Sequence, residues 1–448
     1  MKITTFYETD YVDAASYDNL RKIASVADGL KNSGRKVIHT IIQKNINSDV
    51  KVSRLQSTIS EFTDYLHGED NLSDVIVNMA RRWIGTNQLP LLKDEGNFGK
   101  RFKPKASANR YIFTRKENYV DKLFINDDYP ILLHQTFEDM NIEPRFFVPI
   151  LPVLLINGSR DAVSTGFYQN ILPRGLNEII KMTENYIKTN KYKIPDPSWA
   201  GFNGSISSDK IPNKWNIYGK FTKTSAYSLT ITEVPIGYNL ASYKDFLNNL
   251  EDKKIIQSYT DKSNNEKFNY IVKVNRKFFT DYDNDLKILK VLGLEKSYTE
   301  HFNVMSSENR ILEYTSPEQV FEEYVKIREE FYIKRKQYLI EKITQDIKIA
   351  ASKFLFIKGI VNDSIKIKNT PKADVENQLD NTPGIIQKDK SYSYLLNMPI
   401  QNLTKELMNK ILNDIKELKS YLEDINNKSV QNMWLDDIKE FKKAIKAK

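Results

Sequence analysis

The chain has 448 residues, no cysteine and four histidines, which allows roughly two to four domains of ~100–200 residues each. The absence of cysteine excludes disulfides, cysteine-ligated zinc, iron–sulfur clusters and a cysteine nucleophile, and the histidines are too scattered for an H-E-x-x-H metal site. The formal charge of +9 favours a polyanionic partner without identifying one. No apolar signal segment and no apolar run of ~20 residues is found, so we expect a soluble intracellular protein without membrane association.

The first unusual segment runs from Arg21 to Lys36 and carries five cations. We expect one turn at residues 28–29 (D-G) and a second at residues 32–34 (N-S-G). Helix–turn–helix elements present backbone amides and basic side chains to phosphates in this way. On composition alone, a solvated charged helix joined to its neighbour by a loop is the more common explanation.

A histidine then precedes a glycine at an expected helix start. His67 and Gly68 come just before an apolar helix that we expect over residues 72–83. A histidine at this place could donate to an oxyanion, with help from the free backbone amides of the helix N-terminus. A lone histidine here is more often structural, so the residues alone leave both roles open.

Residues 98–115 combine six cations with interleaved aromatic rings, a typical nucleic-acid surface. Within this segment, Arg110 and Tyr111 open a short strand that we expect over residues 111–114. A phenol with a pKa near ~10 needs a base or a positive charge to become a nucleophile, and an arginine can fork onto phosphate oxygens. The alternative is a strand tyrosine beside an arginine that forms a salt bridge.

The apolar segment at residues 148–158 predicts a buried strand or wedge in its first half. The loop that follows carries Val163, a branched side chain of the kind that can insert between base pairs and kink DNA. An ordinary core residue is the plainer explanation. Further on, residues 228–234 alternate apolar and polar side chains and predict a strand, whereas the D-x-D-x-D at residues 281–285 lacks the surroundings of a metal site.

The last third of the chain is strongly helical. Residues 316–319 (S-P-E-Q) predict a capping box with proline in the first turn, and one helix of about forty residues follows, ~60 Å long. A second long helix is expected over residues 404–443, and the prolines and glycine at 371–399 require the chain to turn between the two. We favour an antiparallel coiled-coil arm over an ordinary helical bundle, because helices of this length are unusual in bundles.

Taken in order, these segments resemble the breakage–reunion core of the type IIA DNA topoisomerases, most closely the medium subunit of T-even-type phage enzymes. The motifs that carry the resemblance are DGLK and RK within 28–36, HGE at 67–69, GTNQLPLLKDEGNFGKR at 85–101, RYIFT at 110–114, FVPILPVLLING at 147–158 and ITEVPIG at 231–237. The resemblance is ordered over residues 15–180 and weaker but consistent to the end of the chain.

The resemblance implies an α+β, predominantly α fold in three domains. These are a winged-helix cleavage domain with a helix–turn–helix at 1–155, a mixed α/β tower domain at 156–315, and a coiled-coil arm at 316–448 with a small helical dimerisation tip at about 360–402. It also implies that Tyr111 attacks a DNA phosphodiester to form a 5′-phosphotyrosyl link and that Arg110 stabilises the transition state. The residues that it assigns to DNA contact are Arg21, Lys51, His67, Arg35, Lys36, Lys100 and Arg101, with Val163 in the place of an intercalating residue.

The same resemblance implies partners and cofactors that this sequence does not itself provide. We expect a homodimer through the tip, double-stranded DNA as substrate, and a large partner subunit that holds Mg²⁺ and binds ATP. We expect no metal site and no ATPase domain on this chain. Such a compact subunit suggests a phage source and a location in the host cytoplasm. The rival functions are a non-catalytic architectural DNA-binding protein with a dimerising coiled coil and a coiled-coil scaffold without DNA affinity.

Overall fold

A computed structural model describes residues 3–264, 266–399 and 404–446 of the chain. Its contacts divide into two compact units, one formed by residues 1–328 with 435–448 and the other by residues 329–434. We describe each unit by itself. Among the described residues, no helix is both long enough and apolar enough to cross a membrane.

The first unit begins with five helices, and the last three of them share an apolar core. In chain order they are α1 (Ile3–Glu8), α2 (Asp10–Lys22), α3 (Asn32–Gln43), α4 (Val52–Thr63) and α5 (Glu69–Ala80). Val37 and Ile41 of α3 pack with Leu55 of α4 and Ile76 of α5, so each of these three helices buries one apolar stripe in a common core. The expected turn at residues 32–34 is wrong, because α3 already begins at Asn32.

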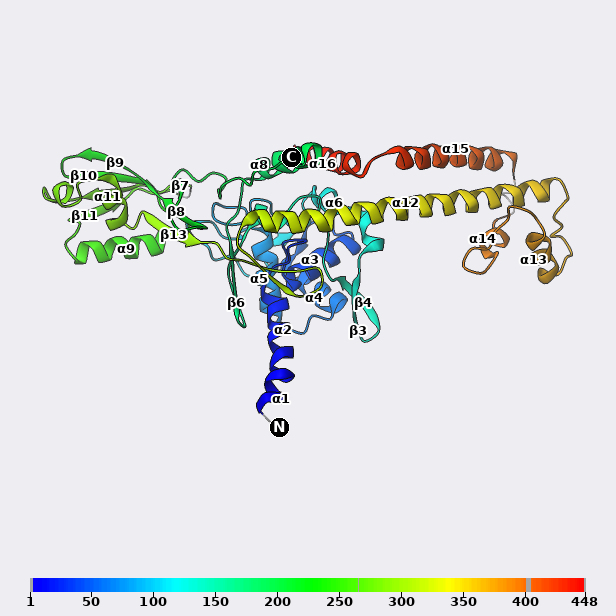
Figure 1. The fold of residues 1–448 in the computed structure, drawn as a ribbon, viewed down its shortest axis with the longest axis horizontal. Coiled ribbons are helices and arrows are strands. Elements are labelled where there is room, and N and C mark those ends of the chain that lie inside the picture. Colours follow the sequence, from blue (N-terminus) through cyan, green and yellow to red (C-terminus); the bar gives the residue numbers. More distant parts are fainter. Residues whose placement is uncertain (1–2, 265, 400–403, 447–448) are drawn as a thin grey trace. The chain divides into compact units, whose positions relative to one another are not determined.

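Short strands and further helices belong to the same unit, the first strand between α3 and α4 and the others after α5 (Figure 1). They are β1 (Val50–Lys51), β2 (Phe113–Thr114), α6 (Val120–Leu123), the 3₁₀ helix η1 (Asn126–Ile131), β3 (His134–Phe137), β4 (Met140–Pro144), α7 (Val153–Asn157), β5 (Ser159–Ser164), β6 (Phe167–Ile171) and α8 (Leu176–Thr189). The strands pair as three two-stranded antiparallel sheets, β1 with β2, β3 with β4 and β5 with β6. The strand expected in the first half of residues 148–158 is wrong: this buried segment is irregular and then enters α7, since Pro149 and Pro152 supply no N–H for a strand ladder.

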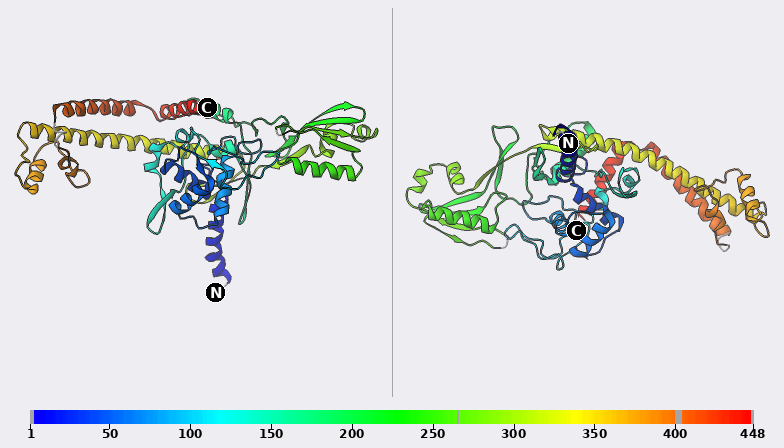
Figure 2. Two further views of the ribbon diagram at one scale, coloured as in Figure 1. Left: turned by 180° about the vertical axis from the view of Figure 1, so that it is seen from behind. Right: turned by 90° about the horizontal axis from the view of Figure 1, so that it is seen from below.

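Residues 205–314 add larger sheets to the first unit. Their elements are β7 (Ser205–Ser208), β8 (Lys214–Tyr218), β9 (Lys220–Ser225), β10 (Ser228–Glu233), α9 (Leu240–Asp252), β11 (Ser258–Asp261), β12 (Tyr270–Lys273), α10 (Phe278–Asp281), α11 (Asp285–Val291), β13 (Glu295–Thr299), β14 (Phe302–Met305) and β15 (Ile311–Tyr314). The predicted strand at 228–234 is confirmed as β10, which lies inside the order β11-β12-β10-β9. Helix α9 covers one face of this sheet, with Tyr243 and Leu247 against Leu229 and Ile231 (Figure 2).

The long helix α12 (Pro317–Val361) begins in the first unit and ends in the second, which confirms the predicted helix start and its length of about forty residues. The predicted capping box differs in one detail. The Gln319 side-chain oxygen accepts hydrogen bonds from the N–H (2.8 Å) and hydroxyl (3.1 Å) of Thr315, one residue before the expected cap. The short helices α13 (Lys372–Asp380) and α14 (Ser393–Leu396) follow in the second unit, around a small apolar core that includes Phe356, Val375 and Leu395.

The single helix expected over residues 404–443 is wrong, because two helices stand there: α15 (Lys405–Asn427) and α16 (Val430–Lys446). Lys428 is extended, and the Ser429 hydroxyl accepts a hydrogen bond from the N–H of Asn432 (3.1 Å), which starts a new helix. The Lys336 ammonium donates to the carbonyls of Asn426 (3.0 Å) and Lys428 (2.8 Å), so it caps carbonyl groups at the break.

Within the second unit, α15 runs antiparallel to the later part of α12 (Figure 1). Coiled-coil packing between them stays a prediction, as do the three domain boundaries. The last residues of the expected tip, 400–402, lie outside the described residues.

Candidate active site

Arg110 and Tyr111 lie at the end of a loop, residues 97–111, which we call the tyrosine loop. The Tyr111 side chain is 66% exposed, and the Arg110 guanidinium lies 4.9 Å from the centre of its ring. The backbone N–H of Tyr111 donates to the carbonyl of Ala108 (2.9 Å) in a tight turn. The strand β2 begins only at Phe113, so the expectation that Tyr111 opens it is wrong by two residues. The turn leaves the phenol open to a macromolecule, with a cation at its side.

The start of α4 supports the tyrosine loop from beneath. The first free amides of this helix, on Val52 and Ser53, donate to the carbonyls of Ile112 (3.0 Å) and Asn109 (3.3 Å). Lys51 precedes them, is exposed, and pairs with Phe113 across β1 and β2. The structure therefore brings Lys51 close along the sheet to the segment that carries Tyr111.

Lys100 and Arg101 are neighbours in the tyrosine loop but have different surroundings. Lys100 is exposed, and its backbone exchanges two hydrogen bonds with Lys103 (2.9 and 3.0 Å). Arg101 is only 6% exposed, because its guanidinium donates to the Glu233 carboxylate (2.8 Å) and the Val234 carbonyl (2.7 Å). Arg101 thus fastens the loop to the end of β10, while Lys100 faces solvent.

Three predicted DNA-contact residues, Arg21, Lys36 and His67, line one pocket of about 330 Å³. The hydroxyl of Tyr17 lies 2.9 Å from Nε2 of His67, and the Arg21 guanidinium lies 5.7 Å from the centre of the Tyr17 ring. Burial lowers the pKa of His67, and the charges of Arg21 and Lys36 lower it further. The lowered pKa favours the neutral imidazole of His67, so the positive charge of the pocket comes mainly from its arginine and lysines.

His67 precedes Gly68, the N-cap residue of α5, which confirms its expected place before a helix start. The helix ends earlier than predicted, at Ala80 rather than at residue 83, because Arg81 is already extended.

Lys36 lies at the floor of the same pocket and is buried. Its ammonium donates to the Glu143 carboxylate of β4 (2.9 Å) and to the carbonyl of Thr63. These bonds hold the ammonium on protein acceptors, so its reach toward a ligand is limited to the floor of the pocket.

Asp28 organises the predicted turn before α3. This fully buried carboxylate accepts hydrogen bonds from Nε of Arg35 (2.8 Å) and from the backbone N–H groups of Leu30 (2.9 Å) and Phe147 (2.9 Å). Gly29 follows at φ +68°, where an added Cβ would lie 2.5 Å from the backbone nitrogen of Leu154. Arg35 is 3% exposed and is committed to Asp28. Its assignment to DNA contact stays a prediction, and this geometry supports a role in holding the turn.

Val163 stands on the β5–β6 hairpin and is 65% exposed. The tip of the hairpin is anchored on α2: the Asp18 carboxylate accepts from the N–H and the hydroxyl of Thr165 (3.0 Å each). The Ser164 hydroxyl also donates to the Asn19 side chain (2.6 Å). A branched apolar side chain is thus held in solvent on an ordered hairpin.

Sequence reasoning missed the residues that hold the predicted ones in place. Glu143 and Glu233 bind the predicted cations Lys36 and Arg101 from elements far away in the chain, and no local spacing marks them. Tyr17 had no signal beyond being aromatic. Among the described residues, no group of three or more histidines and acids could hold a metal ion.

Comparison with known proteins identifies the family. The sequence model for the A-type subunits of DNA gyrase and topoisomerase IV matches residues 21–439. The chain belongs to this family. A crystal structure of the Plasmodium falciparum topoisomerase II DNA-binding, cleavage and re-ligation domain is similar, with a TM-score of 0.89 and 30% identity over 98% of this chain and 64% of that one.

Curated members of the type II topoisomerases are similar over nearly the whole chain. The mitochondrial DNA topoisomerase 2 of Dictyostelium discoideum is 29% identical over 440 residues, which cover 95% of this chain and 34% of that protein. The DNA topoisomerase 2 of Invertebrate iridescent virus 6 is 29% identical over 461 residues, 99% of this chain and 39% of that protein. This family member thus spans between a third and two fifths of the length of these relatives. Its mixed α/β architecture agrees with the solved domain.

Proposed function

We propose that this chain is the DNA-cleaving and religating subunit of an ATP-dependent type IIA DNA topoisomerase. The observation that carries the proposal is the exposed Tyr111 with the Arg110 guanidinium beside its ring, on an ordered loop of a chain from this family. Two copies would each cut one strand of a duplex, and a second duplex would pass through the break. This topology change is an isomerase reaction.

The side chains suit a reversible phosphoryl exchange. The Tyr111 phenol loses its proton, its oxygen bonds to phosphorus, and the bond from phosphorus to the 3′ oxygen breaks, after which that oxygen takes up a proton. Arg110 donates to the phosphate oxygens as negative charge develops on them. The 5′-phosphotyrosyl link conserves the bond energy, so the 3′-hydroxyl can reverse the reaction without another reactant.

DNA contact is proposed for three regions of the first unit. Lys51, Lys100 and Arg110 are exposed around the tyrosine loop, where they can neutralise phosphates. Arg21 and His67 open onto the pocket before α5 and can grip the strand near the cleaved phosphate. Exposed Val163 is proposed to insert between base pairs.

We further infer the finer architecture and the partners from the family. The helices around α3 would form a winged-helix domain, the sheets of residues 205–314 a tower, and α12 with α15 a coiled coil whose tip makes a homodimer. Mg²⁺ and ATP would be bound by a large partner subunit, and Mg²⁺ would stabilise charge at the cleaved phosphate. The location would be cytoplasmic. A T-even phage source stays a prediction.

Covalent trapping tests the proposal. The chain is mixed with plasmid DNA, Mg²⁺ and a candidate ATPase subunit, then denatured to capture adducts. We expect the wild type to carry covalent DNA and Tyr111→Phe to carry none while it still binds DNA. Tyr227→Phe is the matched control, because Tyr227 is another exposed tyrosine, on the β9–β10 turn.

An adduct on Tyr111→Phe would overturn the assignment of the nucleophile. The wild type could instead bind DNA and form no adduct, although the ATPase subunit in the assay is known to be active. That result would support the architectural DNA-binding alternative.

A further inference from the structure

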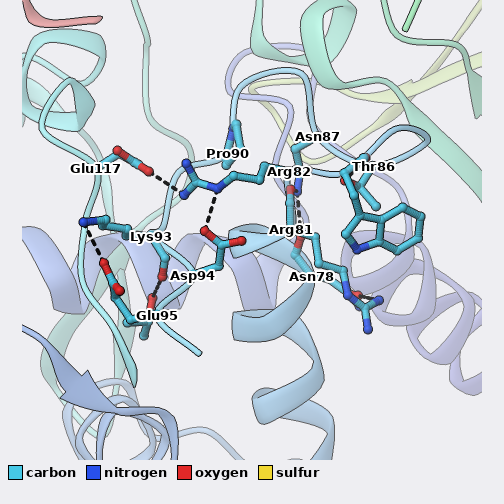
Figure 3. Close-up of polar contacts among 12 residues, drawn as sticks. Asn78, Arg81, Arg82, Thr86, Asn87, Pro90, Lys93, Asp94, Glu95 and Glu117 are labelled. Atoms are coloured by element: carbon cyan, nitrogen blue, oxygen red, sulfur yellow. Dashed lines mark hydrogen bonds and ion pairs between the residues drawn. The ribbon is translucent and has the colours of Figure 1, made fainter. Parts of the chain in front are cut away.

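Two consecutive arginines follow the last residue of α5, and their side chains diverge (Figure 3). Arg81 reaches toward the tyrosine loop before Tyr111, and Arg82 reaches toward the segment that follows Tyr111. Neither arginine belongs to the residues proposed above to react or to contact DNA. Their contacts connect α5, which starts beside His67, to both sides of the nucleophile.

Arg81 closes the base of the first part of the tyrosine loop. Its Nε donates to the carbonyl of Phe98 (3.2 Å) and its Nη2 to the carbonyl of Pro104 (2.9 Å). Gly99 lies between these two residues at φ +87°, and an added Cβ would approach the Pro104 oxygen to 2.3 Å. The two carbonyls therefore come close together at the base, and one guanidinium supplies a donor to each.

The guanidinium of Arg81 already donates from each of its three nitrogens to the protein. Its third nitrogen, Nη1, donates to the Asn78 side chain (2.7 Å). The Asn87 amide in turn donates to the carbonyls of Asn78 (2.6 Å) and Arg81 (2.8 Å), which fixes the turn after α5 (Figure 3). Arg81 is thus oriented by its own neighbours and is engaged at all three nitrogens.

Arg82 fastens the segment after Tyr111. Its Nε pairs with Asp94 (2.6 Å) and its Nη2 with Glu117 (2.7 Å), and the ion pairs are partly buried (Figure 3). Asp94 and Glu117 lie on two segments that also exchange backbone hydrogen bonds between Glu95 and Phe113 (2.9 and 3.0 Å). Arg82 therefore holds together the pair of segments that runs directly out of the tyrosine loop.

We propose that Arg81 and Arg82 are positioning residues for Tyr111, acting together as a clamp from the end of α5. Tyr111 lies between the segment held by Arg81 and the segment held by Arg82, so its place depends on both. A displacement of about 1 Å at a reacting group can lower a rate by roughly 10²-fold. This inference rests on the proposed function for the reaction and on the contacts above for the clamp.

The test separates positioning from DNA contact. Arg81→Met keeps the apolar stem and removes all donors, and Arg81→Lys keeps the charge and can reach one carbonyl. With saturating DNA, Mg²⁺ and the partner subunit, we expect the single-turnover rate of adduct formation to fall roughly 10- to 100-fold in Arg81→Met and less in Arg81→Lys. The dissociation constant for DNA and its salt dependence should stay within about twofold of the wild type, since Arg81 contacts no phosphate.

A second measurement does not use activity. Hydrogen exchange of the amides of Lys100, Lys103 and Ser107, which donate within the tyrosine loop, should become faster in Arg81→Met. Arg82→Met should speed exchange at Phe113 and Glu117. Arg310→Met is the matched control, because Arg310 is an exposed arginine that pairs only loosely with Glu308 (3.8 Å). It should change neither the rate nor the exchange.

Unchanged adduct rates and unchanged exchange in Arg81→Met would overturn the clamp. The clamp would also be overturned if DNA affinity fell as much as the rate of adduct formation and depended less steeply on salt concentration. That result would identify Arg81 as a phosphate contact. If Arg81→Met does not fold, Arg81→Lys serves the same test: its rate of adduct formation should fall by a smaller factor while its dissociation constant for DNA stays unchanged. A wild type that forms no adduct would defeat the proposed function alone, and the exchange data would still test the clamp.

Discussion

The basic residues predicted to contact DNA fall into two groups that look alike in the sequence and differ in the fold. Arg35 and Arg101 are buried and paired with Asp28 and Glu233. Lys51, Lys100 and Arg110, by contrast, are exposed. The pair Lys100–Arg101 shows the contrast in adjacent positions, because one side chain faces solvent and the next holds the loop to β10.

The difference comes from buried acids that the fold places beside the arginines. Asp28 is seven residues before Arg35, and Glu233 is 132 residues after Arg101. An arginine can be buried only where a carboxylate and other acceptors compensate its charge, and removing the partner leaves a costly buried charge. The exposed cations need no such partner and remain available for phosphates. A count of basic residues around a nucleophile therefore overstates the number that can touch DNA directly.

The largest effect should come from breaking a buried pair. Arg35→Met leaves Asp28 as a buried carboxylate without its guanidinium, and we expect the free energy of unfolding to fall by about 3–5 kcal/mol. Urea denaturation followed by circular dichroism measures this loss. Arg110→Met is the control from the exposed group, and its unfolding free energy should change by less than about 0.5 kcal/mol.

Equal losses of stability in Arg35→Met and Arg110→Met would remove the distinction between the two groups. A loss confined to Arg35→Met, with DNA affinity per folded molecule unchanged, would assign Arg35 to the turn.

Low pH should cause a smaller loss of stability, through the buried His39 next to Lys36. His39 is 3% exposed, its Nδ1 lies 3.0 Å from the hydroxyl of Tyr129, and its ring stacks on Phe62. Burial lowers the pKa of His39 to about 4, with smaller contributions from the charges of His134 and Lys36. Because the unfolded chain binds a proton near pH ~6.5, stability should fall as the pH drops from ~6.5 to ~4, by about 3 kcal/mol in total.

The His39 contribution is separated from other acid effects by substitution. His39→Gln should flatten the dependence of the unfolding free energy on pH between ~6.5 and ~4, whatever its effect at pH 7. His301→Gln, at an exposed histidine, should keep the wild-type slope. The same slope in both variants would show that His39 does not titrate differently on folding.

Local signals in the sequence predicted some elements well. The start of α12 at Pro317 and the turn at Asp28–Gly29 follow from proline and glycine chemistry within a few residues, and both are present. The turn predicted at residues 32–34 (N-S-G) was wrong, because asparagine and serine suit a helix start as well as a turn. Gly34 lies inside α3, near Met79 of α5. The break at Ser429 was missed because the apolar periodicity before it suggested continuation.

The candidate site shows the same limit. Arg110 and Tyr111 became candidates because the motif RYIFT at 110–114 resembles the active-site strand of the family, and their roles stay a prediction. The clamp of Arg81 depends on the carbonyls of Phe98 and Pro104, and main-chain acceptors leave no mark in a sequence. The pairing of Lys36 with Glu143 likewise depends on β4 lying against α3, which only the tertiary structure provides.

The smallest effects should come from the exposed cations, and they sharpen the comparison most directly. Lys100→Gln and Lys51→Gln should each change the unfolding free energy by less than about 0.5 kcal/mol. Each phosphate contact that is lost should reduce the slope of log affinity against log salt concentration by about 0.9, so the double variant should lose about 1.8. Fluorescence titration of labelled duplex DNA at several salt concentrations measures this slope.

Lys372→Gln, at an exposed lysine of α13 in the second unit, is the control and should keep the wild-type slope. If the double variant kept the slope as well, these lysines would be solvated surface and the phosphate contacts would have to be sought in the pocket of Arg21 and Lys36.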